Sequence, residues 1–280
     1  MPFADSGGVR ISYEKAGEGE PLLLIMGYGL PGVAWAVSLP YFTPRFQAVY
    51  FDNRGTGSSD APDDGYEIAD FARDALAVMD AAGWESAHVF GVSMGGMIAQ
   101  QLALDAPQRV RSLVLGCTSS GEPEERTPEQ EEAVRTLGEA VALMQEDPER
   151  SVRLMLPLSY PQPFLDAHPE LAPLMVAMAK AMPTKKAPEI RLDDAAVLQW
   201  KSAPRLAELT MPALILHGTD DRLIPVSHAF RLLEGLPQAE LRVFKGAGHA
   251  FQALDMAGIT RGIAEWLAAK SNLPTAAPSR

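Results

Sequence analysis

Gly91-Val92-Ser93-Met94-Gly95-Gly96 follows directly on the apolar run Ala87-His88-Val89-Phe90. This G-x-S-x-G pattern stands where a strand should give way to a helix, so it predicts a sharp turn that lifts the serine hydroxyl above a sheet. Side chains two residues before and two residues after the serine would collide in such a turn, and both positions are glycine. The following helix would direct its unpaired N–H groups and its positive dipole end at whatever binds beside Ser93.

Short apolar runs alternate with helical patterns along most of the chain. Because strands that alternate with helices form parallel sheets, this order predicts an α/β fold, with a mostly parallel central sheet and helices on both faces. A weakly alternating segment at residues 9–15 should form an edge strand. The other expected strands are residues 21–26, 46–51, 87–91, 110–116, 212–217 and 241–244, and the expected helices are residues 68–82, 94–104 and 259–267.

Residues 118–208 interrupt this alternation, because they lack strand patterns and contain many prolines. Thr127-Pro128 is a helix start, with a capping side chain followed by proline at the first helical position. The segment therefore predicts a helical cap inserted into the sheet domain. The core comprises residues 1–117 and 209–270, the cap residues 118–208, and residues 271–280 are expected to form a flexible tail.

Composition excludes several classes of partner. The chain has 280 residues, of which 47% are hydrophobic, as suits one α/β domain with an insertion. The formal net charge of −12 argues against nucleic acid or an anionic membrane as a partner, because both attract basic patches. No apolar run reaches the roughly 18–20 residues of a membrane span. The oligomeric state stays open.

The cysteine content and the N-terminal residues give an expectation about the cellular compartment of the protein. The one cysteine, Cys117, cannot form an intrachain disulfide, and we expect it to be a buried structural residue. Residues 1–5 lack the basic region and apolar stretch of a signal peptide. We therefore expect a cytoplasmic protein.

Ser93 needs a base if it is to act as a nucleophile, because a serine hydroxyl reacts poorly until a histidine takes its proton. Among five histidines, His249 lies in the glycine-rich segment Gly246-Ala247-Gly248-His249, which follows the last expected strand. His249 is therefore the candidate base. His217, at the end of another expected strand, should instead bond to backbone in the core.

The histidine in turn needs a carboxylate that fixes its tautomer and steadies its positive charge. Asp220 and Asp221 both follow the expected strand at residues 212–217, and the residues alone leave the choice between them open. The other strand end where an acid could lie, after residue 116, offers Cys117 and no carboxylate. No cluster of His, Cys and carboxylate residues has metal-binding spacing.

Two fixed N–H donors should stabilise the tetrahedral intermediate. One is the backbone N–H of Met94, directly after the serine. The other is expected from the loop Gly27-Tyr28-Gly29, most simply the N–H of Tyr28. Losing one such donor typically costs about 3–4 kcal/mol of transition-state stabilisation.

Taken together, these segments resemble the capped α/β-hydrolase superfamily, most closely its esterase and enol-lactonase branch, and the order Ser, Asp, His is that of the family. The resemblance implies that Asp221 is the acid, that Arg54 anchors a structural loop, and that no metal or organic cofactor is needed. The segments that carry it are Met26-Gly27-Tyr28-Gly29, Asp52-Asn53-Arg54-Gly55-Thr56-Gly57-Ser58-Ser59-Asp60, the serine turn, Gly218-Thr219-Asp220-Asp221-Arg222-Leu223-Ile224-Pro225 and Gly248-His249.

One position departs from the family pattern. Many relatives carry a histidine before the glycine of the oxyanion loop, where this chain has Met26. That histidine supports the loop, so another side chain must support it here.

The expected cap is rich in methionine and other apolar residues, which predicts an apolar substrate pocket beneath it. The residues expected to line this pocket are Gly27, Gly29, Leu30, Met155, Leu156 and Trp200. The chemistry and the resemblance together predict a serine hydrolase that cleaves a small, largely apolar carboxylic ester or lactone. Hydrolysis of a carbon–carbon bond beside a ketone, perhydrolysis with the same triad, and a ligand receptor on a hydrolase fold are the alternatives.

Overall fold

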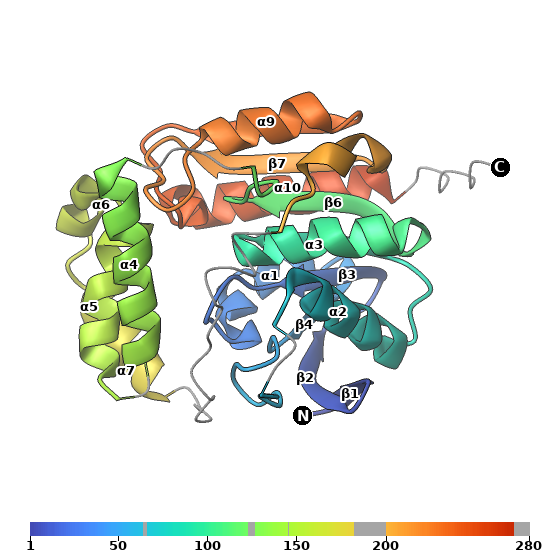
Figure 1. Cartoon of the computed structure of the whole chain (residues 1–280), viewed down its shortest axis with the longest axis horizontal. Coiled ribbons are helices and arrows are strands. Elements are labelled where there is room, and N and C mark those ends of the chain that lie inside the picture. The colour runs from blue at the N-terminus through green and yellow to red at the C-terminus, as the bar shows by residue number, and fades with distance from the viewer. Residues whose placement is uncertain (64–65, 123–126, 145, 182–199, 272–280) are drawn as a thin grey trace.

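An eight-stranded sheet runs through the described part of the chain, with helices on both faces and a further layer of helices beyond one end (Figure 1). The computed structural model describes residues 1–63, 66–122, 127–144, 146–181 and 200–271. Its strands are β1 (Phe3–Ser6), β2 (Val9–Ala16), β3 (Glu20–Ile25), β4 (Phe46–Phe51), β5 (Ala87–Val92), β6 (Val110–Gly116), β7 (Ala213–Gly218) and β8 (Ala239–Phe244).

The strands lie in the order β1-β2-β4-β3-β5-β6-β7-β8. All neighbours from β4 to β8 are parallel, whereas β2 is antiparallel to both β1 and β4. The predicted mostly parallel sheet is therefore confirmed. The carboxyl ends of the parallel strands share one edge, which is where ligands bind in sheets of this kind.

The prediction of an edge strand at residues 9–15 is wrong. Residues Phe3–Ser6 pair antiparallel with β2, from Phe3 opposite Ser12 to Ser6 opposite Val9, so β1 is the edge and β2 lies inside it. β1 has only four residues and Phe3 is largely exposed, so the stretch is too short to show an alternating pattern.

Helices cover the two faces of the sheet in separate sets. α2 (Ile68–Ala82), α3 (Met94–Asp105) and α9 (Ser227–Gly235) pack on one face, and α1 (Leu39–Phe42) with α10 (Met256–Lys270) packs on the other. Strand β3 shows why both faces are apolar, because Leu23 and Ile25 face the first set while Leu22 and Leu24 face the second. The 3-10 helices are η1 (Gly32–Val37), η2 (Pro107–Arg109), η3 (Ala203–Glu208) and η4 (Phe251–Asp255).

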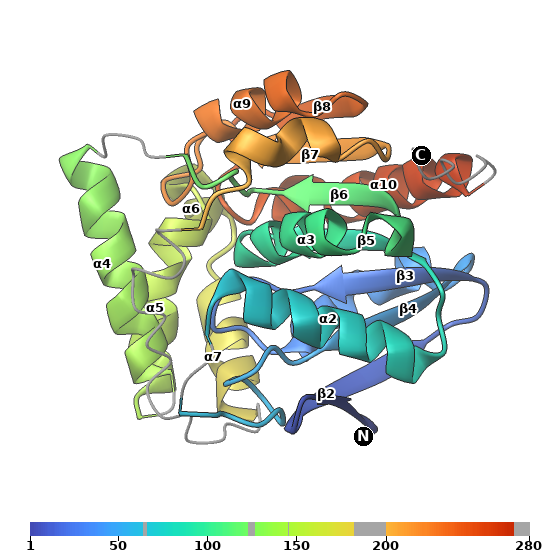
Figure 2. The same ribbon diagram turned by 45° about the vertical axis from the view of Figure 1, so that its right-hand side comes forward.

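The cap helices are α4 (Pro128–Leu143), α5 (Pro148–Ser159), α6 (Gln162–Ala167) and α7 (Leu171–Ala181). Figure 2 shows the arrowheads of β3 and β6 pointing toward this layer, so it lies at the carboxyl ends of the strands. As predicted, α4 begins after Thr127, whose N–H donates to the Gln130 side chain at 2.7 Å. The remaining positions of the expected cap and tail, residues 123–126, 145, 182–199 and 272–280, lie outside the described residues.

The two ends of the insertion meet at the sheet. The Ser202 N–H donates to the Ser120 carbonyl at 2.9 Å, and the Ser202 hydroxyl donates to Gln100 on α3 at 2.7 Å. All three residues are buried. The chain therefore leaves and re-enters the core at one place, which a polar contact closes.

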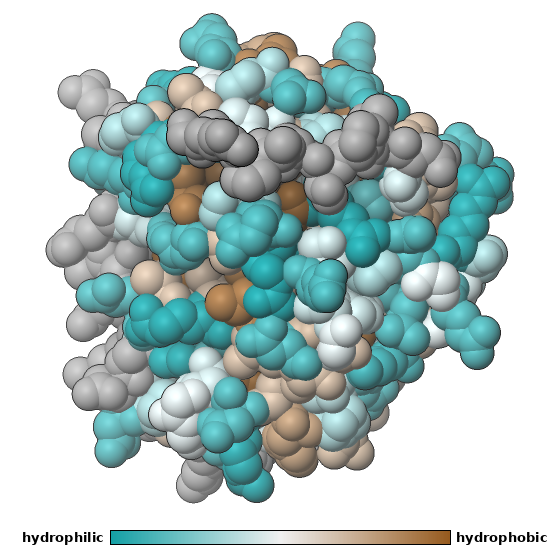
Figure 3. Space-filling view, turned by 90° about the vertical axis from the view of Figure 1, so that its right-hand side faces the viewer, coloured by the Kyte–Doolittle hydropathy of each residue, from teal (hydrophilic) through white to brown (hydrophobic). Residues whose placement is uncertain are grey.

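The opposite side of the molecule, at the amino ends of the strands, is mostly hydrophilic, with hydrophobic residues in small separate groups (Figure 3). Among the described residues, no helix combines the length and the apolar character that a membrane span requires.

Candidate active site

The turn between β5 and α3 holds Ser93 in a backbone conformation that few residues adopt, with φ of 56° and ψ of −124°. The flanking glycines make this possible. A Cβ on Gly91 would lie 2.1 Å from the Gly95 carbonyl oxygen, and a Cβ on Gly95 would lie 2.2 Å from the Ile25 carbonyl oxygen. The predicted collision of side chains on either side of the serine is thus confirmed.

The loop after β3 borders Ser93 on one side. A Cβ on Gly27 would lie 3.1 Å from Ser93 Cβ and 3.6 Å from Ser93 Oγ. Met94 borders the serine on the other side as the first residue of α3, a position whose N–H has no acceptor within its own helix. The two segments that carry the predicted oxyanion donors, Tyr28 and Met94, therefore both adjoin the hydroxyl.

The loop after β3 has no histidine at position 26 to support it, and Asn53 supplies that support instead. Its side-chain amide donates to the Met26 carbonyl at 3.1 Å, and Asn53 is 1% exposed. The neighbouring Asp52 carboxylate accepts from the Gly32 N–H at 2.8 Å, which ties down the far end of the same loop. Sequence reasoning missed Asn53, and its one signal was a polar residue two positions after the end of the buried strand β4.

Arg54 anchors its loop, as expected. Its guanidinium makes two hydrogen bonds to the Asp74 carboxylate on α2, each 2.7 Å long. Both side chains are buried, and burial raises the pKa of Asp74 while the Arg54 charge opposes that rise. A buried pair with two parallel bonds fixes the loop firmly against α2.

The choice between the two aspartates is settled by their contacts. His249 Nδ1 lies 2.7 Å from Asp221 Oδ2, and Asp221 Oδ1 accepts from the N–H groups of Leu223 at 2.9 Å and Ile224 at 3.0 Å. Asp220 is exposed and accepts from the Thr219 hydroxyl at 2.6 Å. Asp221 is the partner of His249.

The two charges of this pair shift each other's pKa. Burial alone would raise the pKa of Asp221, but His249 and His217 together outweigh it and hold that pKa below its usual range. Burial alone would lower the pKa of His249, but the Asp221 charge, with a smaller contribution from Cys117, raises it well above 6.5. The arrangement favours a positive imidazole that can hold a proton during a reaction.

Cys117 lies between the serine and the acid. It acts on the His249 imidazole and contributes to the raised pKa of that ring, and its backbone adopts a φ of 42° at the end of β6. Sequence analysis expected a buried structural cysteine, and Cys117 is 3% exposed, but the contact with His249 was not foreseen. The structure contains no hydrogen bond between the Ser93 hydroxyl and His249, a contact that in many enzymes forms fully only with substrate bound.

Backbone hydrogen bonds tie these strand ends together. The Ser93 N–H donates to the Gly116 carbonyl, and the Cys117 N–H donates to the Leu216 carbonyl, each at 2.8 Å. The Thr118 hydroxyl also donates to the Ser93 carbonyl at 2.7 Å. The serine turn, the Cys117 position and β7 are thereby held as one unit.

The cap touches the site at two places. The Ser159 carbonyl at the end of α5 accepts from the Ala250 N–H at 3.0 Å, one residue beyond the base. A Cβ on Gly29 would lie 3.1 Å from a methyl group of Val141 on α4, so this helix lies on the oxyanion loop. Both contacts bring the cap close to the backbone of a loop that carries a candidate site residue.

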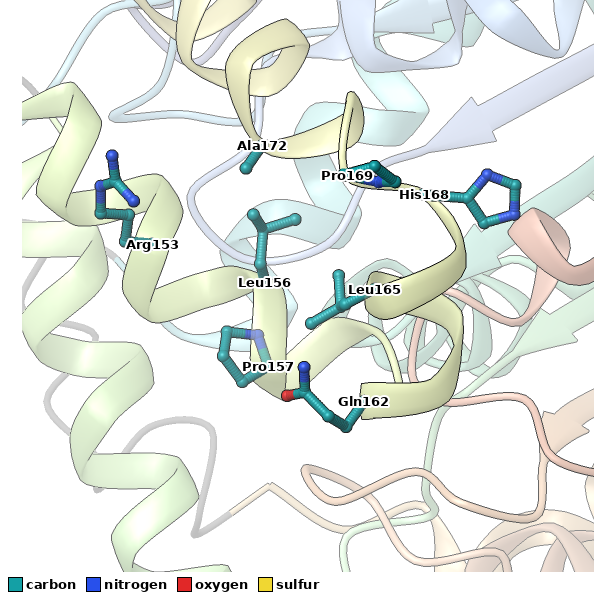
Figure 4. Close-up of a pocket in the computed structure, with 8 residues that line it drawn as sticks. All are labelled: Arg153, Leu156, Pro157, Gln162, Leu165, His168, Pro169 and Ala172. Carbon is teal, nitrogen blue, oxygen red and sulfur yellow. The ribbon is translucent and has the colours of Figure 1, made fainter.

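The cap also contains a cavity of about 300 Å³. Figure 4 shows Leu156, Leu165 and Ala172 between Arg153 on one side and His168 on the other. Leu156, one of the expected pocket residues, lines this cavity, and Ser93, Asp221 and His249 do not.

Trp200, another expected pocket residue, donates its indole N–H to Gln101 on α3 at 2.8 Å and packs beside the core cluster of α2 and α3. Met155 lies on α5 and is partly exposed, and Leu30 packs against the cluster of α1 and α10. Among the described residues, no group of three or more His, Cys, Asp or Glu side chains could hold a metal ion.

Comparison with known proteins agrees with this fold. A family model described as the alpha/beta hydrolase fold matches residues 20–255. A candidate carbamate hydrolase, RutD, from Azorhizobium caulinodans is 32% identical over 257 residues, which cover 91% of this chain and 93% of that protein.

Two solved structures are similar over almost the whole chain. An N-acyl homoserine lactone degrading enzyme, Est816, has a TM-score of 0.74 at 29% identity and covers 93% of this chain and 99% of its own. The meta-cleavage product hydrolase from Pseudomonas fluorescens has a TM-score of 0.79 at 26% identity, with 97% and 98% covered. These names have hydrolysis in common and differ in the bond that is cleaved.

Proposed function

The chain belongs to the α/β-hydrolase family, and from this premise we propose that it is a serine hydrolase of carboxylic esters or lactones. The substrate would be small and largely apolar. The observation that carries the proposal is the 2.7 Å hydrogen bond between Asp221 and His249, both on loops beside the strained Ser93 turn. An aspartate that raises the pKa of a histidine, on the sheet edge that also carries a serine in a strained turn, fits the arrangement that acyl transfer requires.

In the proposed reaction, the Ser93 hydroxyl oxygen attacks the substrate carbonyl carbon while His249 takes the hydroxyl proton. The oxyanion that forms accepts hydrogen bonds from the N–H groups of Tyr28 and Met94. When the intermediate collapses, the bond from the carbonyl carbon to the leaving oxygen breaks, and His249 gives its proton to that oxygen. Asp221 stabilises the imidazolium throughout and is not itself protonated.

The second half of the reaction repeats these steps with water. His249 takes a proton from a water molecule, whose oxygen attacks the ester carbon of the acyl-enzyme. The bond to Ser93 then breaks, and the serine oxygen recovers its proton from His249. With a lactone, the alcohol that leaves in the first half stays attached to the acyl group, so one hydroxy acid is released.

We place the substrate between the serine turn and the cap. Gly27, Gly29 and Leu30 would border it from the oxyanion loop, and Met155 and Leu156 from α5. The contact of Val141 with Gly29 supports this, because it brings the cap onto the loop that would hold the carbonyl. Trp200 is the weakest member of the expected set, since its indole already bonds to Gln101.

Labelling with a fluorophosphonate, followed by intact-mass measurement and peptide mapping, tests the nucleophile. We expect one adduct on Ser93, and hydrolysis of p-nitrophenyl esters that Ser93→Ala abolishes. An adduct elsewhere, or esterase activity that persists at the wild-type rate in Ser93→Ala, would contradict the proposal. Binding of a small apolar ligand with no turnover would favour the receptor alternative.

A second candidate is hydrolysis of a carbon–carbon bond beside a ketone with the same three side chains. The similarity to the meta-cleavage product hydrolase over 97% of this chain favours it. A panel that contains p-nitrophenyl esters, a lactone series, a vinylogous diketone and an aryl carbamate, assayed at equal concentration, separates these possibilities. The highest kcat/KM in the panel identifies the bond class.

A further inference from the structure

Two imidazoles meet at one oxygen of the Asp221 carboxylate. His249 Nδ1 lies 2.7 Å from Oδ2, and His217 Nε2 lies 3.4 Å from the same atom. The side chains of His217 and Asp221 are both 0% exposed. His249 has a role in the reaction proposed above, whereas that reaction uses His217 nowhere.

The contacts of His217 identify which ring nitrogen carries the proton. Nε2 lies 2.8 Å from the Ile224 carbonyl oxygen as well as 3.4 Å from the Asp221 carboxylate, and both of these oxygens only accept hydrogen bonds. Nδ1 is buried and has no hydrogen-bond partner among the described residues. The geometry therefore assigns the proton to Nε2, which donates to the Ile224 carbonyl while the ring edge faces the Asp221 carboxylate at 3.4 Å.

These two contacts of Nε2 link a rigid element to a loop. His217 belongs to β7, a central strand paired on both sides with β6 and β8. Asp221 and Ile224 belong to the loop that leaves this strand. The His217 N–H thus bonds the loop back to the strand at Ile224, and the same nitrogen lies 3.4 Å from the Asp221 oxygen that faces His249.

We propose that His217 is a positioning residue that holds Asp221 Oδ2 against His249. The inference rests on the proposed function, because it concerns the acid of that triad. Two backbone N–H groups hold Oδ1, and without His217 the other oxygen would keep only the mobile base as a donor. Small errors in the placement of a catalytic group carry large rate penalties.

The test compares His217→Met with His217→Gln. Both replacements are unbranched and similar in size, but only glutamine can return an N–H donor near the position of Nε2. His88→Met is the matched control, because His88 is also a fully buried strand histidine with two hydrogen bonds, and it lies near the start of β5. Each variant is measured for Tm, for kcat and KM with the best ester, and for the low-field proton resonance of the Asp221–His249 hydrogen bond.

We expect His217→Met to lower kcat by about 10- to 100-fold, because the acid is misplaced, with KM nearly unchanged. The low-field resonance should shift or disappear. His217→Gln should recover most of kcat and the resonance, and His88→Met should keep both even where its Tm falls.

Wild-type kcat and an unchanged resonance in His217→Met would overturn the inference. So would equal losses in the glutamine and methionine variants that follow Tm alone, since that result describes a purely structural residue. If the wild type cleaves no ester and takes no fluorophosphonate, the proposed function fails, and the resonance in His217→Met still decides whether His217 positions Asp221.

Discussion

The loops at the carboxyl ends of the strands and the helices of the cap touch each other, yet different contacts hold them. The loops are fixed by backbone hydrogen bonds between strand ends and by buried polar side chains such as Asn53. Most of the buried residues of the cap helices lie on α5, which buries Ser151, Val152, Leu156 and Leu158. Helices α6 and α7 have no buried residue, and α4 buries only Ala133 and Ala140.

Ion pairs between exposed side chains provide much of the polar contact within the cap. Arg150 pairs with Glu139, and the side chains are 61% and 46% exposed. Pairs of this kind typically contribute about 0–1 kcal/mol each. The difference in contacts between the loops and the cap suits their roles. Reacting groups must be placed to a fraction of an ångström. A cap over varied apolar groups need only pack loosely.

The largest expected effect is chemical and lies in the core. Asp221→Asn should lower kcat by about 10⁴-fold, because the amide cannot hold His249 in its working tautomer or steady its charge. Initial rates with a p-nitrophenyl ester measure this loss. A loss of less than about tenfold would show that the core contact does not govern the chemistry.

The same variant should move the pH profile. His249 acts as a base only when unprotonated, so kcat/KM of the wild type should fall as the pH drops through a His249 pKa that lies well above 6.5. Without the Asp221 charge, burial alone would lower this pKa, and the acid limb should move to lower pH. An acid limb at the same pH in both proteins would contradict this assignment.

Gly95→Ala tests how tightly the backbone packs around Gly95 in the core. The new Cβ would lie 2.2 Å from the Ile25 carbonyl oxygen, and backbone cannot move away as a side chain can. We expect unfolding free energy to fall by about 3 kcal/mol or more, with loss of fluorophosphonate labelling. Urea unfolding gives the first quantity, and intact-mass measurement gives the second.

A buried histidine should make the core sensitive to acid. Burial, with a smaller contribution from Arg111, lowers the pKa of His88 to about 4. Between about pH 6.5 and 4 the unfolded chain therefore binds a proton that the folded chain refuses, so stability rises with pH in this window. Because of His88, the unfolding free energy should be about 3 kcal/mol higher above pH 6.5 than near pH 4.

The difference in unfolding free energy between the wild type and His88→Gln, followed from pH 7.5 to 4, isolates this contribution from that of the carboxylates. The pH slope should be less steep in the variant. Parallel curves for the two proteins would show that His88 does not titrate as its burial implies.

The smallest effect belongs to the cap. Gly138→Ala on α4 places a Cβ where nothing lies within 4 Å. The change should stabilise the helix by about 0.5–1 kcal/mol and leave kcat unchanged. Gly95→Ala is the same substitution in the core. Equal changes in unfolding free energy at Gly138 and Gly95 would show that the core and the cap do not differ in how tightly they pack.

Strongly apolar elements were predictable to the residue. The expected bounds of β4, β6 and α2 match the structure, and Gly83 ends α2 with a φ of 80°. α9 was missed, because it has only nine residues and follows closely on the loop that carries Asp221. In such segments, packing against the sheet decides the structure more than local pattern does.

The site was predictable where a local motif carried it, as at Ser93. Asp220 and Asp221 could not be separated from sequence, because both follow the same strand, and the return of the chain at Leu223 and Ile224 selects Asp221. The contact of Cys117 with His249 arises from the pairing of β6 with its neighbours, and no motif encodes that contact.

The contact between Ser202 and Ser120, where the insertion leaves and rejoins the core, has an evolutionary consequence. A segment whose two ends lie together can be lengthened, shortened or replaced without moving any strand, because the loop-closure free energy grows slowly with length. Descendants of this chain could therefore change substrate by exchanging the whole cap. An engineer could splice a foreign cap at the same two serines, provided that it restores the carbonyl that Ser159 offers to Ala250.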